Sequence, residues 1–277
     1  MEGEDVVLYE EVGHIAVFTL NRPDARNAIN AKVSARFEEL LNLFEGDSNM
    51  YVGIVASSHP KTFCAGADLK AVNKRERIFS RKGGFAGLVQ YPRTKPLIAA
   101  VDGAALAGGC EIVLACDLVV ASSSATFGVP EVKRSLVAGA GGLFRLPQRL
   151  PRQMAMELIL TGDPMSAARA KELGFVNELV EPGAARAAAL ALAERIAQNA
   201  PLAVRESKIC VDRMSLMNDN EAFNESNRAL VKLFMSKDFS EGPRAFIEKR
   251  APKWTAKHPP MLWSLAVSLW YTGRARL

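Results

Sequence analysis

The sequence lacks the marks of several protein classes. Its four cysteines form no CxxC pair and do not combine with the three histidines at zinc-ligand spacing, which argues against a metal site and a disulfide framework. Residues 1–9 carry acids where a signal peptide has basic residues before an apolar stretch, and no apolar run reaches the roughly 20 residues of a membrane span. We therefore expect a protein of a reducing compartment, the cytoplasm, without a metal.

Several catalytic and binding signatures are missing as well. There is no Gly-x-Ser-x-Gly nucleophile motif. Gly139-Ala140-Gly141-Gly142 follows no predicted strand, as a dinucleotide fingerprint would, so we assign it to the start of a helix. No aromatic run typical of RNA-recognition motifs accompanies the basic residues, and we expect no nucleic-acid partner.

What is present is the composition of a globular protein, with 49% hydrophobic and 23% charged residues among 277. This length suits one main domain with an appendage. The net charge of +5 favours anionic partners. Much of this excess positive charge lies in one cluster: Lys70, Lys74, Arg75, Arg77, Arg81 and Lys82. The cluster is either part of a solvated loop or a surface that faces an anion.

Strands and helices alternate in the first half of the chain. Apolar stretches predict strands at 12–20, 51–57, 97–101 and 118–121. A helix between the first two has its apolar face at Phe37, Leu40, Leu41 and Phe44, and another begins at Gly108. Beyond residue 139 the chain is mostly helical. This order predicts an α/β fold with a parallel sheet covered by helices.

Two segments of small residues each follow a predicted strand and start a predicted helix. They are Phe63-Cys64-Ala65-Gly66-Ala67-Asp68-Leu69-Lys70 and Ala104-Ala105-Leu106-Ala107-Gly108-Gly109-Cys110-Glu111. N–H groups at a helix start lack partners within the helix, and small side chains let a ligand approach them. Both segments are candidate oxyanion-binding turns, although a tight turn alone explains either one.

Two glutamates lie at predicted helix starts. Glu111 stands among apolar neighbours, and Glu131 follows Pro130, which can begin a short helix. Each acid could merely stabilise its helix start. Together, two carboxylates and two backbone donors suit hydration of an enoyl thioester. The donors stabilise charge on the carbonyl oxygen, one carboxylate takes a proton from water, and the other gives a proton to the α-carbon.

The two segments of small residues and a third, Thr126-Phe127-Gly128-Val129-Pro130-Glu131, resemble in their order and spacing the enoyl-CoA hydratase/isomerase (crotonase) superfamily. The likeness extends over nearly the whole chain, from Asn21-Arg22-Pro23-Asp24-Ala25-Arg26-Asn27-Ala28 to Lys249-Arg250-Ala251-Pro252. It implies a crotonase-like ββα spiral with a C-terminal helical section, which periodicity alone does not distinguish from a doubly wound sheet. We place the spiral core at 1–200 and the helical section at 201–277, where it would pack between subunits of a homotrimer or hexamer.

The resemblance also implies roles for individual residues. The backbone N–H groups of Ala67 and Gly108 would form the oxyanion hole, Glu111 would act as the base toward water, and Glu131 would protonate the α-carbon. Coenzyme A is then part of the substrate, and no separate cofactor is expected. Its contacts would be Arg26, Ala28, Ala65, Ala67, Asp68, Leu69 and Lys70.

Because isomerases of the superfamily often lack one of the two acids, their presence favours a hydro-lyase, an enoyl-CoA hydratase of fatty-acid β-oxidation or related acyl-CoA metabolism. Gly83-Gly84-Phe85-Ala86-Gly87-Leu88 resembles the carnitinyl-CoA dehydratase branch. A carnitinyl-CoA-type dehydratase, an enoyl-CoA isomerase and an RNA-binding hydratase homologue therefore stay as alternatives. We expect the segments 79–88 and 136–144 to set the acyl chain length. Ala107 stands where many relatives have glycine, and we expect little effect from it.

The C-terminal end carries two further signals. The apolar segment 261–271 is too short to cross a bilayer and suits docking on a subunit surface, with membrane association as the alternative. Ala275-Arg276-Leu277 loosely resembles a peroxisomal signal, which makes the peroxisomal matrix the alternative to the cytoplasm.

Overall fold

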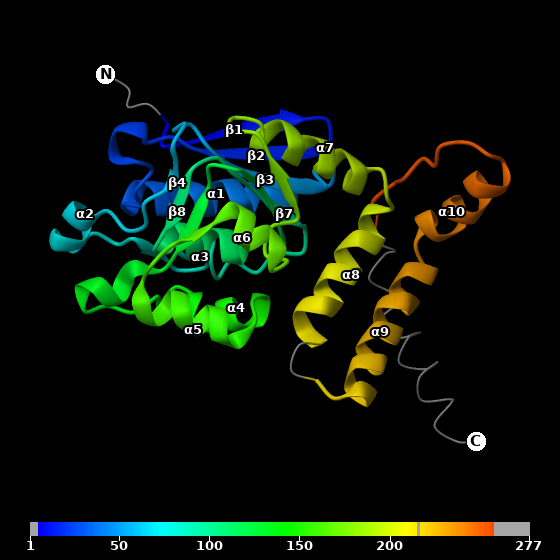
Figure 1. Cartoon of the computed structure of the whole chain (residues 1–277). Coiled ribbons are helices and arrows are strands. Elements are labelled where there is room, and N and C mark those ends of the chain that lie inside the picture. The colour runs from blue at the N-terminus through cyan, green and yellow to red at the C-terminus, as the bar shows by residue number, and fades with distance from the viewer. Residues whose placement is uncertain (1–4, 215–216, 258–277) are drawn as a thin grey trace. The chain divides into compact units, whose positions relative to one another are not determined.

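The computed structural model describes residues 5–214 and 217–257 and divides the chain into two compact units, residues 1–196 and 197–277 (Figure 1). The sequence analysis placed the division after residue 200. The apolar segment 261–271 and the C-terminal Ala275-Arg276-Leu277 lie outside the described residues. The interpretations drawn from these two segments therefore stay predictions.

Two largely parallel sheets form the core of the first unit. The larger has the strand order β1 (Val7–Val12), β2 (Ile15–Leu20), β3 (Val52–Ser57), β7 (Leu97–Val101), β9 (Leu118–Ser122) and β12 (Glu178–Val180). The smaller has the order β11 (Met165–Ser166), β10 (Thr126–Gly128), β8 (Ala104–Leu106) and β4 (Thr62–Cys64). Only β1–β2 and β10–β11 pair antiparallel within these two sheets.

The chain passes from one sheet to the other in a repeating order. Strand β3 is followed by β4, β7 by β8 and β9 by β10, and the second strand of each pair leads into a helix. Those helices are α2 (Leu69–Asn73), α3 (Gly108–Ala115) and the 3-10 helix η2 (Pro130–Arg134). This order confirms the ββα spiral and excludes a doubly wound sheet, because each repeat supplies one strand to each of two sheets.

The prediction of a single strand at residues 12–20 is wrong. Strands β1 and β2 form an antiparallel hairpin in which Val12 pairs with Ile15, and Gly13 in the turn takes φ +58°. A left-handed φ of this kind favours glycine. The apolar run of β2 was recognised, but the strand before the turn was not, because in β1 only Val7 is buried and the other residues are exposed or partly exposed.

Helix α1 (Ala31–Gly46) packs on the larger sheet with the apolar face that its periodicity predicted. Phe37, Leu40, Leu41 and Phe44 are at most 1% exposed. Phe18 of β2 lies 5.4 Å from Phe37 and 5.6 Å from Phe44 between ring centroids. Such aromatic contacts add to the free energy gained from apolar burial. They hold α1 firmly on the larger sheet.

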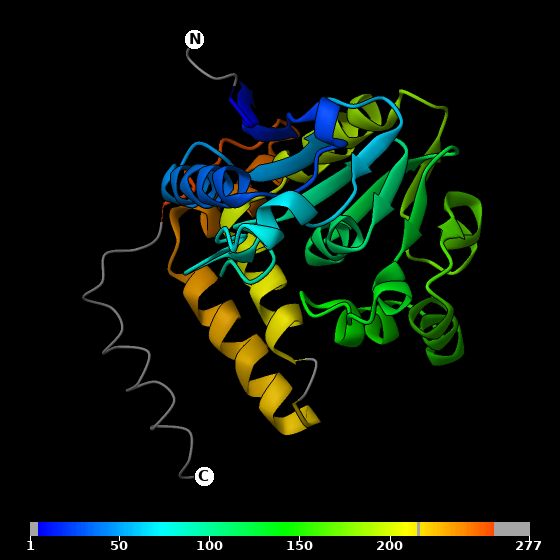
Figure 2. The same cartoon turned by 90° about the vertical axis from the view of Figure 1, so that its left-hand side faces the viewer.

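Helix α3 packs against the smaller sheet. Helix α3 contacts β4, β8 and α4 (Gly142–Arg149). In both views α3 lies between the strands and the pair formed by α4 and α5 (Arg152–Thr161) (Figures 1 and 2). All its residues are buried. Helices α6 (Ala167–Glu172) and α7 (Ala185–Ala197) complete the unit.

The second unit is helical, as predicted for the C-terminal section. It holds α8 (Pro201–Met214), α9 (Asp219–Phe234) and α10 (Lys237–Ile247). An ion pair joins Glu206 of α8 to Lys232 of α9 at 2.9 Å, and the buried Asp238 of α10 accepts hydrogen bonds from Thr255 and Ala256. Among the described residues we find no helix with the length and hydropathy needed to traverse a lipid bilayer.

Candidate active site

The three segments singled out in the sequence meet at one edge of the smaller sheet. Strands β4, β8 and β10 lie side by side, with Cys64 paired to Ala105 and Gly128 paired to Leu106. Because these strands are parallel, their carboxyl ends reach the same edge. The chain beyond each strand therefore brings Ala67, Gly108 and Glu131 to a common place.

Ala67 and Gly108 both present backbone N–H groups without acceptors in the described part of the chain. Gly108 is the first residue of α3, where an N–H has no partner within the helix. Ala67 forms a parallel bridge with Ile29. In that bridge Ile29 donates to the Gly66 carbonyl at 2.8 Å and accepts from the Asp68 N–H at 2.9 Å, so the N–H of Ala67 points away from it.

Glycines let the two donor segments approach each other. A Cβ atom on Gly66 would lie 3.0 Å from the Gly108 nitrogen, and one on Gly109 would lie 2.1 Å from the Cys64 carbonyl oxygen. A Cβ on Gly108 would lie 2.4 Å from the ring of Phe85, which belongs to β6 (Gly84–Phe85). The sequence left open whether these small residues allow a ligand to approach or only form a tight turn. The structure shows that they first serve the packing of the protein on itself.

The expectation that Ala107 matters little is wrong in one respect. Its backbone takes φ +52° and ψ −128°, in the region that favours glycine. A residue with a Cβ atom is strained there at a cost of about 1–2 kcal/mol. Its N–H donates to the Gly128 carbonyl at 2.9 Å, and its own carbonyl accepts from Glu111, so the strained residue joins β10 to the first turn of α3.

Glu111 is a buried acid held by a backbone donor. Its side chain is on α3 and 3% exposed, and Oε1 accepts a hydrogen bond from the Gly142 N–H at 2.9 Å. Burial raises the pKa of Glu111 to about 7; the hydrogen bond from Gly142 opposes this shift and the nearby Glu131 adds to it. A carboxyl group that titrates near neutral pH can both accept and release a proton.

Glu131 lies in η2 with one oxygen enclosed. Its Oε2 is buried and has no hydrogen-bond partner among the described residues. Burial raises the pKa of Glu131, against the effects of a hydrogen bond from its own backbone and the charge of Arg134. An enclosed carboxyl oxygen without a donor favours the protonated form, which suits a proton donor. A Cβ atom on Gly142 would lie 3.3 Å from Glu111 Oε1 and 3.4 Å from Val129 Cγ1, so Glu111 lies close to the start of the segment that carries Glu131.

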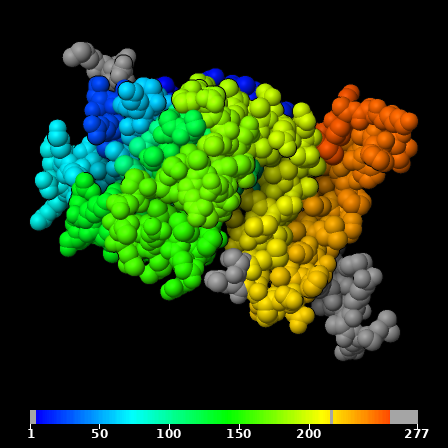
Figure 3. All heavy atoms as spheres, in the orientation of Figure 1, coloured from blue at the N-terminus to red at the C-terminus, as the bar shows by residue number. Residues whose placement is uncertain are grey.

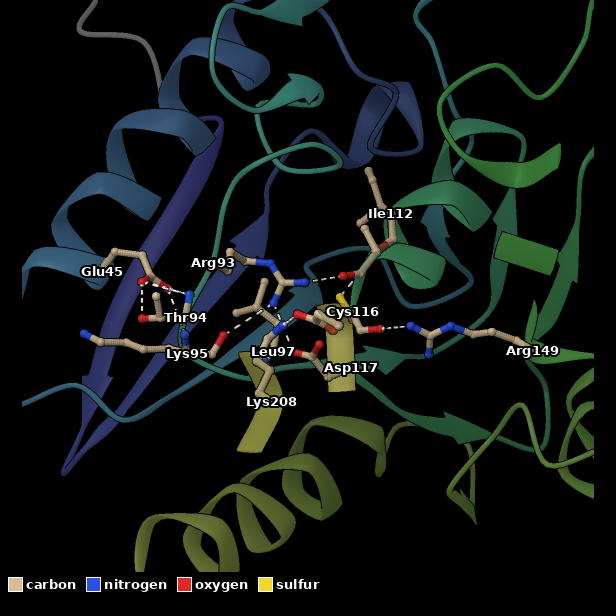
Figure 4. A network of polar contacts seen from close by, with 12 residues as sticks. Glu45, Arg93, Thr94, Lys95, Leu97, Ile112, Cys116, Asp117, Arg149 and Lys208 are labelled. Atoms are coloured by element: carbon tan, nitrogen blue, oxygen red, sulfur yellow. Dashed lines mark hydrogen bonds and ion pairs between the residues drawn. The ribbon is translucent and has the colours of Figure 1, made fainter. Parts of the chain in front are cut away.

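The far end of α3 is anchored by arginines. Arg93 donates to the Ala115 carbonyl and forms an ion pair with Asp117 at 3.0 Å, and Arg149 donates to the Cys116 carbonyl at 3.0 Å (Figure 4). In the same network Asp117 accepts from the Leu97 N–H at 2.7 Å. Cations at a helix C-terminus satisfy its last carbonyls. These contacts hold α3, and with it Glu111, in place between β7 and α4.

The two turns predicted to hold coenzyme A lie side by side. The Ala65 N–H donates to the Arg26 carbonyl at 3.1 Å, and Arg22 donates to the Ala28 carbonyl. Arg26, Ala65, Leu69 and Lys70 are exposed, whereas Ala28 and Ala67 are partly exposed. In the space-filling view the segment that carries α2 projects from the edge of the first unit (Figure 3). The basic residues of this segment are therefore accessible to an anion.

Asp68 has a structural role in this arrangement. Its carboxylate caps α2 by accepting from the N–H groups of Lys70 and Ala71, and it forms an ion pair with Arg22 at 3.1 Å. Although burial opposes it, the hydrogen bonds from Arg22 and from these backbone groups lower the pKa of Asp68. The ionised carboxylate of Asp68 would repel a phosphate, so this side chain is suited to holding the turn and not to binding an anion.

The two segments expected to set the acyl chain length, 79–88 and 136–144, differ in how far their apolar side chains are buried. Phe85 is 3% exposed and packs on Gly108. Leu136, Val137, Leu143 and Phe144 are exposed by 44 to 63%. The first segment thus forms a wall beside a candidate donor, whereas the second presents apolar side chains to its surroundings.

Three features of the site escaped the sequence analysis. Gly139–Gly142 was assigned only to a helix start, yet the Gly142 N–H holds Glu111. The packing of Phe85 on Gly108 joins residues 23 positions apart and has no local signal. The roles of the arginines around α3 depend on the same long-range contacts. No group of His, Cys, Asp or Glu in the described ranges is arranged to hold a metal ion.

Comparison with known proteins gives consistent matches. The family model described as enoyl-CoA hydratase/isomerase matches residues 10–257. The chain is 40% identical over 252 residues to enoyl-CoA hydratase EchA19 of Mycobacterium tuberculosis, covering 88% of this chain and 94% of the relative. It is 37% identical over 252 residues to carnitinyl-CoA dehydratase of Proteus mirabilis, covering 88% and 96%. The crystal structure of an enoyl-CoA hydratase from Mycobacterium tuberculosis H37Rv superposes with a TM-score of 0.89 at 48% identity, covering 92% of this chain and all of that chain.

Proposed function

Because the chain belongs to the enoyl-CoA hydratase/isomerase family, we propose that it is an enoyl-CoA hydratase, a hydro-lyase that adds water across the 2,3 double bond of a 2-enoyl-CoA thioester. The observation that carries the proposal is the buried Glu111 and the partly buried Glu131 at the edge where Ala67 and Gly108 present N–H groups without acceptors among the described residues. Fold and family membership agree with the prediction from the sequence.

The geometry supports a role for each group. The N–H groups of Ala67 and Gly108 bind the thioester oxygen and stabilise the negative charge that develops there. Glu111 takes a proton from water as the water oxygen bonds to the β-carbon. Glu131 gives its proton to the α-carbon. Transfer of the proton from Glu111 back to Glu131 through solvent restores the starting state.

The pKa shifts suit both acids to proton transfer. Glu111, with a pKa of about 7, is substantially ionised at neutral pH and can act as the base. Burial also raises the pKa of Glu131, and its Oε2 has no donor among the described residues, so this carboxyl can carry the proton that the α-carbon receives. Since both shifts come first from burial, the enclosure of the two side chains is what prepares them for proton transfer.

The substrate's coenzyme A would lie along the turns of Arg26 to Ala28 and Ala65 to Lys70. What supports this is the exposure of Arg26 and Lys70 and the parallel course of the two turns. The coenzyme is part of the substrate in this proposal, and the reaction needs no other cofactor. The basic cluster that begins at Lys70 supplies the positive charge for its phosphates.

A carnitinyl-CoA dehydratase is the second candidate. It is supported by the likeness to carnitinyl-CoA dehydratase of Proteus mirabilis and by the glycine-rich segment 83–88 beside Gly108. The same two acids would remove water in that reaction, so the catalytic assignment does not depend on the choice. The acyl group alone separates the two candidates.

We also propose assembly into a homotrimer or hexamer through the second unit. Helices α9 and α10 expose large apolar side chains, which soluble monomers rarely gather in one unit. The exposed fractions are 69% for Phe223, 46% for Leu230, 48% for Phe234, 84% for Phe246 and 78% for Ile247.

The experiment that tests the proposed reaction follows the loss of the conjugated enoyl-thioester absorbance with crotonyl-CoA. The wild type should show turnover, and Glu131→Gln should lower it by at least about 100-fold, as expected for loss of a positioned proton donor. Glu157→Gln, at an exposed position on α5, is the matched control and should retain wild-type turnover. A silent wild type would contradict the proposal and favour the dehydratase.

A further inference from the structure

Arg145 of α4 is a mostly buried cation that no part of the proposed mechanism uses. Its Nη2 donates to the Val89 carbonyl at 2.8 Å, and its Nη1 is buried without a hydrogen-bond partner among the described residues. Burying a guanidinium group with an unsatisfied N–H costs free energy unless its charge has another use. The groups that surround the guanidinium indicate what this charge does.

The guanidinium closes against the turn that holds Glu111. A Cβ on Gly141 would lie 2.5 Å from Arg145 Nη1, and the Arg145 N–H donates to the Gly141 carbonyl at 2.9 Å. Gly141 itself takes φ +119°, which only glycine adopts readily. The next residue, Gly142, donates its N–H to Glu111 Oε1. Arg145 therefore fixes the turn from which the base receives its hydrogen bond.

The Arg145 side chain also connects this turn to the segment of Phe85, which packs on the candidate oxyanion donor Gly108. Val89, whose carbonyl accepts from Arg145, donates its own N–H to the carbonyl of Phe85 at 3.2 Å. Phe85 packs on Gly108. A single residue thus ties the segment beside the oxyanion donor to the segment beside the base.

The positive charge of Arg145 also acts on Glu111, whose pKa it lowers. The groups that influence Glu111 come from each element packed against it. Glu131 of η2 raises its pKa, whereas the N–H groups of Gly142 and Ala140 and the charge of Arg145 lower it. On α3 itself, burial raises the pKa of the Cys110 thiol, which is neutral at pH 7. For Arg145, burial and the charges of Arg93 and Arg149 lower the pKa, and Glu111 and Cys116 raise it.

We propose that Arg145 is a positioning residue for hydration, which holds the Gly141–Gly142 turn on Glu111 and favours the ionised form of that carboxyl. This inference rests on the proposed role of Glu111 as the base. It assigns to Arg145 no contact with the substrate. Loss of the guanidinium should therefore change the pH dependence of turnover more than substrate binding.

The test measures kcat and KM for crotonyl-CoA as functions of pH in Arg145→Gln, Arg145→Lys and the control Arg152→Gln. Arg152→Gln removes one positive charge at an exposed position, the first residue of α5. Arg145→Gln removes the guanidinium that packs on the Gly141–Gly142 turn and, with it, a positive charge that lowers the pKa of Glu111. It should therefore move the acidic limb of kcat/KM upward by up to about one pH unit. Near pH 7 kcat should fall about 10-fold, with KM changed less than about 3-fold. Arg145→Lys should return the limb toward its wild-type position, and Arg152→Gln should leave it there.

An unmoved limb in Arg145→Gln, or a limb in Arg145→Lys that moves as far as in Arg145→Gln, would overturn the inference. If Arg145→Gln fails to fold, the lysine variant decides, because a limb displaced by more than about half a pH unit contradicts the role of the charge. Failure of the proposed function has a different signature. It would appear as a wild type without turnover, or as a Glu111→Gln variant with wild-type activity.

Discussion

The burial of Glu111 makes the free energy of unfolding depend on pH. Its pKa is raised from 4.5 to about 7 in the folded protein, so between these values the folded state binds more protons than the unfolded one. The stability that the protonated side chain retains at pH 4 to 5 is lost as pH rises through 7. The loss amounts to at most about 3 kcal/mol, from 1.36 kcal/mol per pKa unit.

The first prediction follows from this sign. Glu111→Gln should raise the free energy of unfolding at pH 8.5 by up to about 3 kcal/mol while changing it little at pH 5, since glutamine still accepts from Gly142 and carries no charge. Urea unfolding at the two pH values measures it. Glu157→Gln, exposed on α5, should show no such difference. A gain of equal size at both pH values would show that burial of charge is not the cause.

Ala107 gives the second prediction at this scale. Because its φ of +52° and ψ of −128° suit glycine, Ala107→Gly should stabilise the protein by about 1 kcal/mol despite the greater freedom of glycine in the unfolded chain. Thermal unfolding measures the change, with Ala105→Gly in β8 as the control, which should destabilise. A less stable Ala107→Gly variant would show that the strand-to-helix turn is unstrained.

The sequence offered candidates for the residues of the site but not for their contacts. Glu111 and Glu131 could be proposed because each lies in the first turn of a helix whose start the sequence marks. The hydrogen bond from Gly142, the packing of Phe85 on Gly108 and the position of Arg145 could not, because each joins segments that only tertiary structure brings together. The φ of Ala107 likewise depends on the hydrogen bond that the residue makes to β10.

At the scale of elements, the loop between α2 and β7 is fixed by one side chain of α1. Oε2 of Glu38 accepts hydrogen bonds from Ser80 Oγ at 2.5 Å and from the N–H groups of Lys82 and Gly83 at 2.9 and 2.6 Å. Although burial opposes it, these hydrogen bonds lower the pKa of Glu38. The stability they contribute is present above the unfolded pKa of 4.5 and is lost as pH falls through the lower pKa of the folded state.

The third prediction concerns this loop. Glu38→Ala should speed amide hydrogen exchange in residues 80–90 by at least about 10-fold, because the loop loses its shared acceptor. Hydrogen-exchange mass spectrometry measures it, and Glu39→Ala is the matched control because Glu39 is exposed and forms an ion pair with Arg36 of the same helix. Equal exchange in both variants would mean that Gly87, packed on Ser34, holds the loop without Glu38.

The elements were predicted unevenly for a physical reason. Long apolar strands such as Leu97–Val101 and the amphipathic α1 have strong periodicity and were found. The short strands β4, β8 and β10 have three residues each, too few for a periodic signal. These three strands belong to the smaller sheet. The ββα spiral could therefore be predicted from the family resemblance but not from the periodicity of apolar residues.

At the scale of the whole molecule, the exposed apolar residues of α10 lead to a prediction on assembly. Phe246→Glu should dissociate the proposed trimer or hexamer, because a charge at a buried subunit contact is costly. Sedimentation velocity measures the change. Ser240→Glu, at an exposed polar position of the same helix, should leave the assembly intact. A wild type that sediments as a monomer would contradict the assembly without affecting the chemistry.

The most direct test of the central claim identifies the product of crotonyl-CoA in water labelled with ¹⁸O and deuterium. The account predicts that the wild type adds one labelled oxygen at the β-carbon and one deuterium at the α-carbon, and that Glu111→Gln and Glu131→Gln each form this product at least about 100-fold more slowly. Mass spectrometry distinguishes the positions. Unchanged substrate, or a product that takes up deuterium without oxygen, would contradict hydration by these two acids.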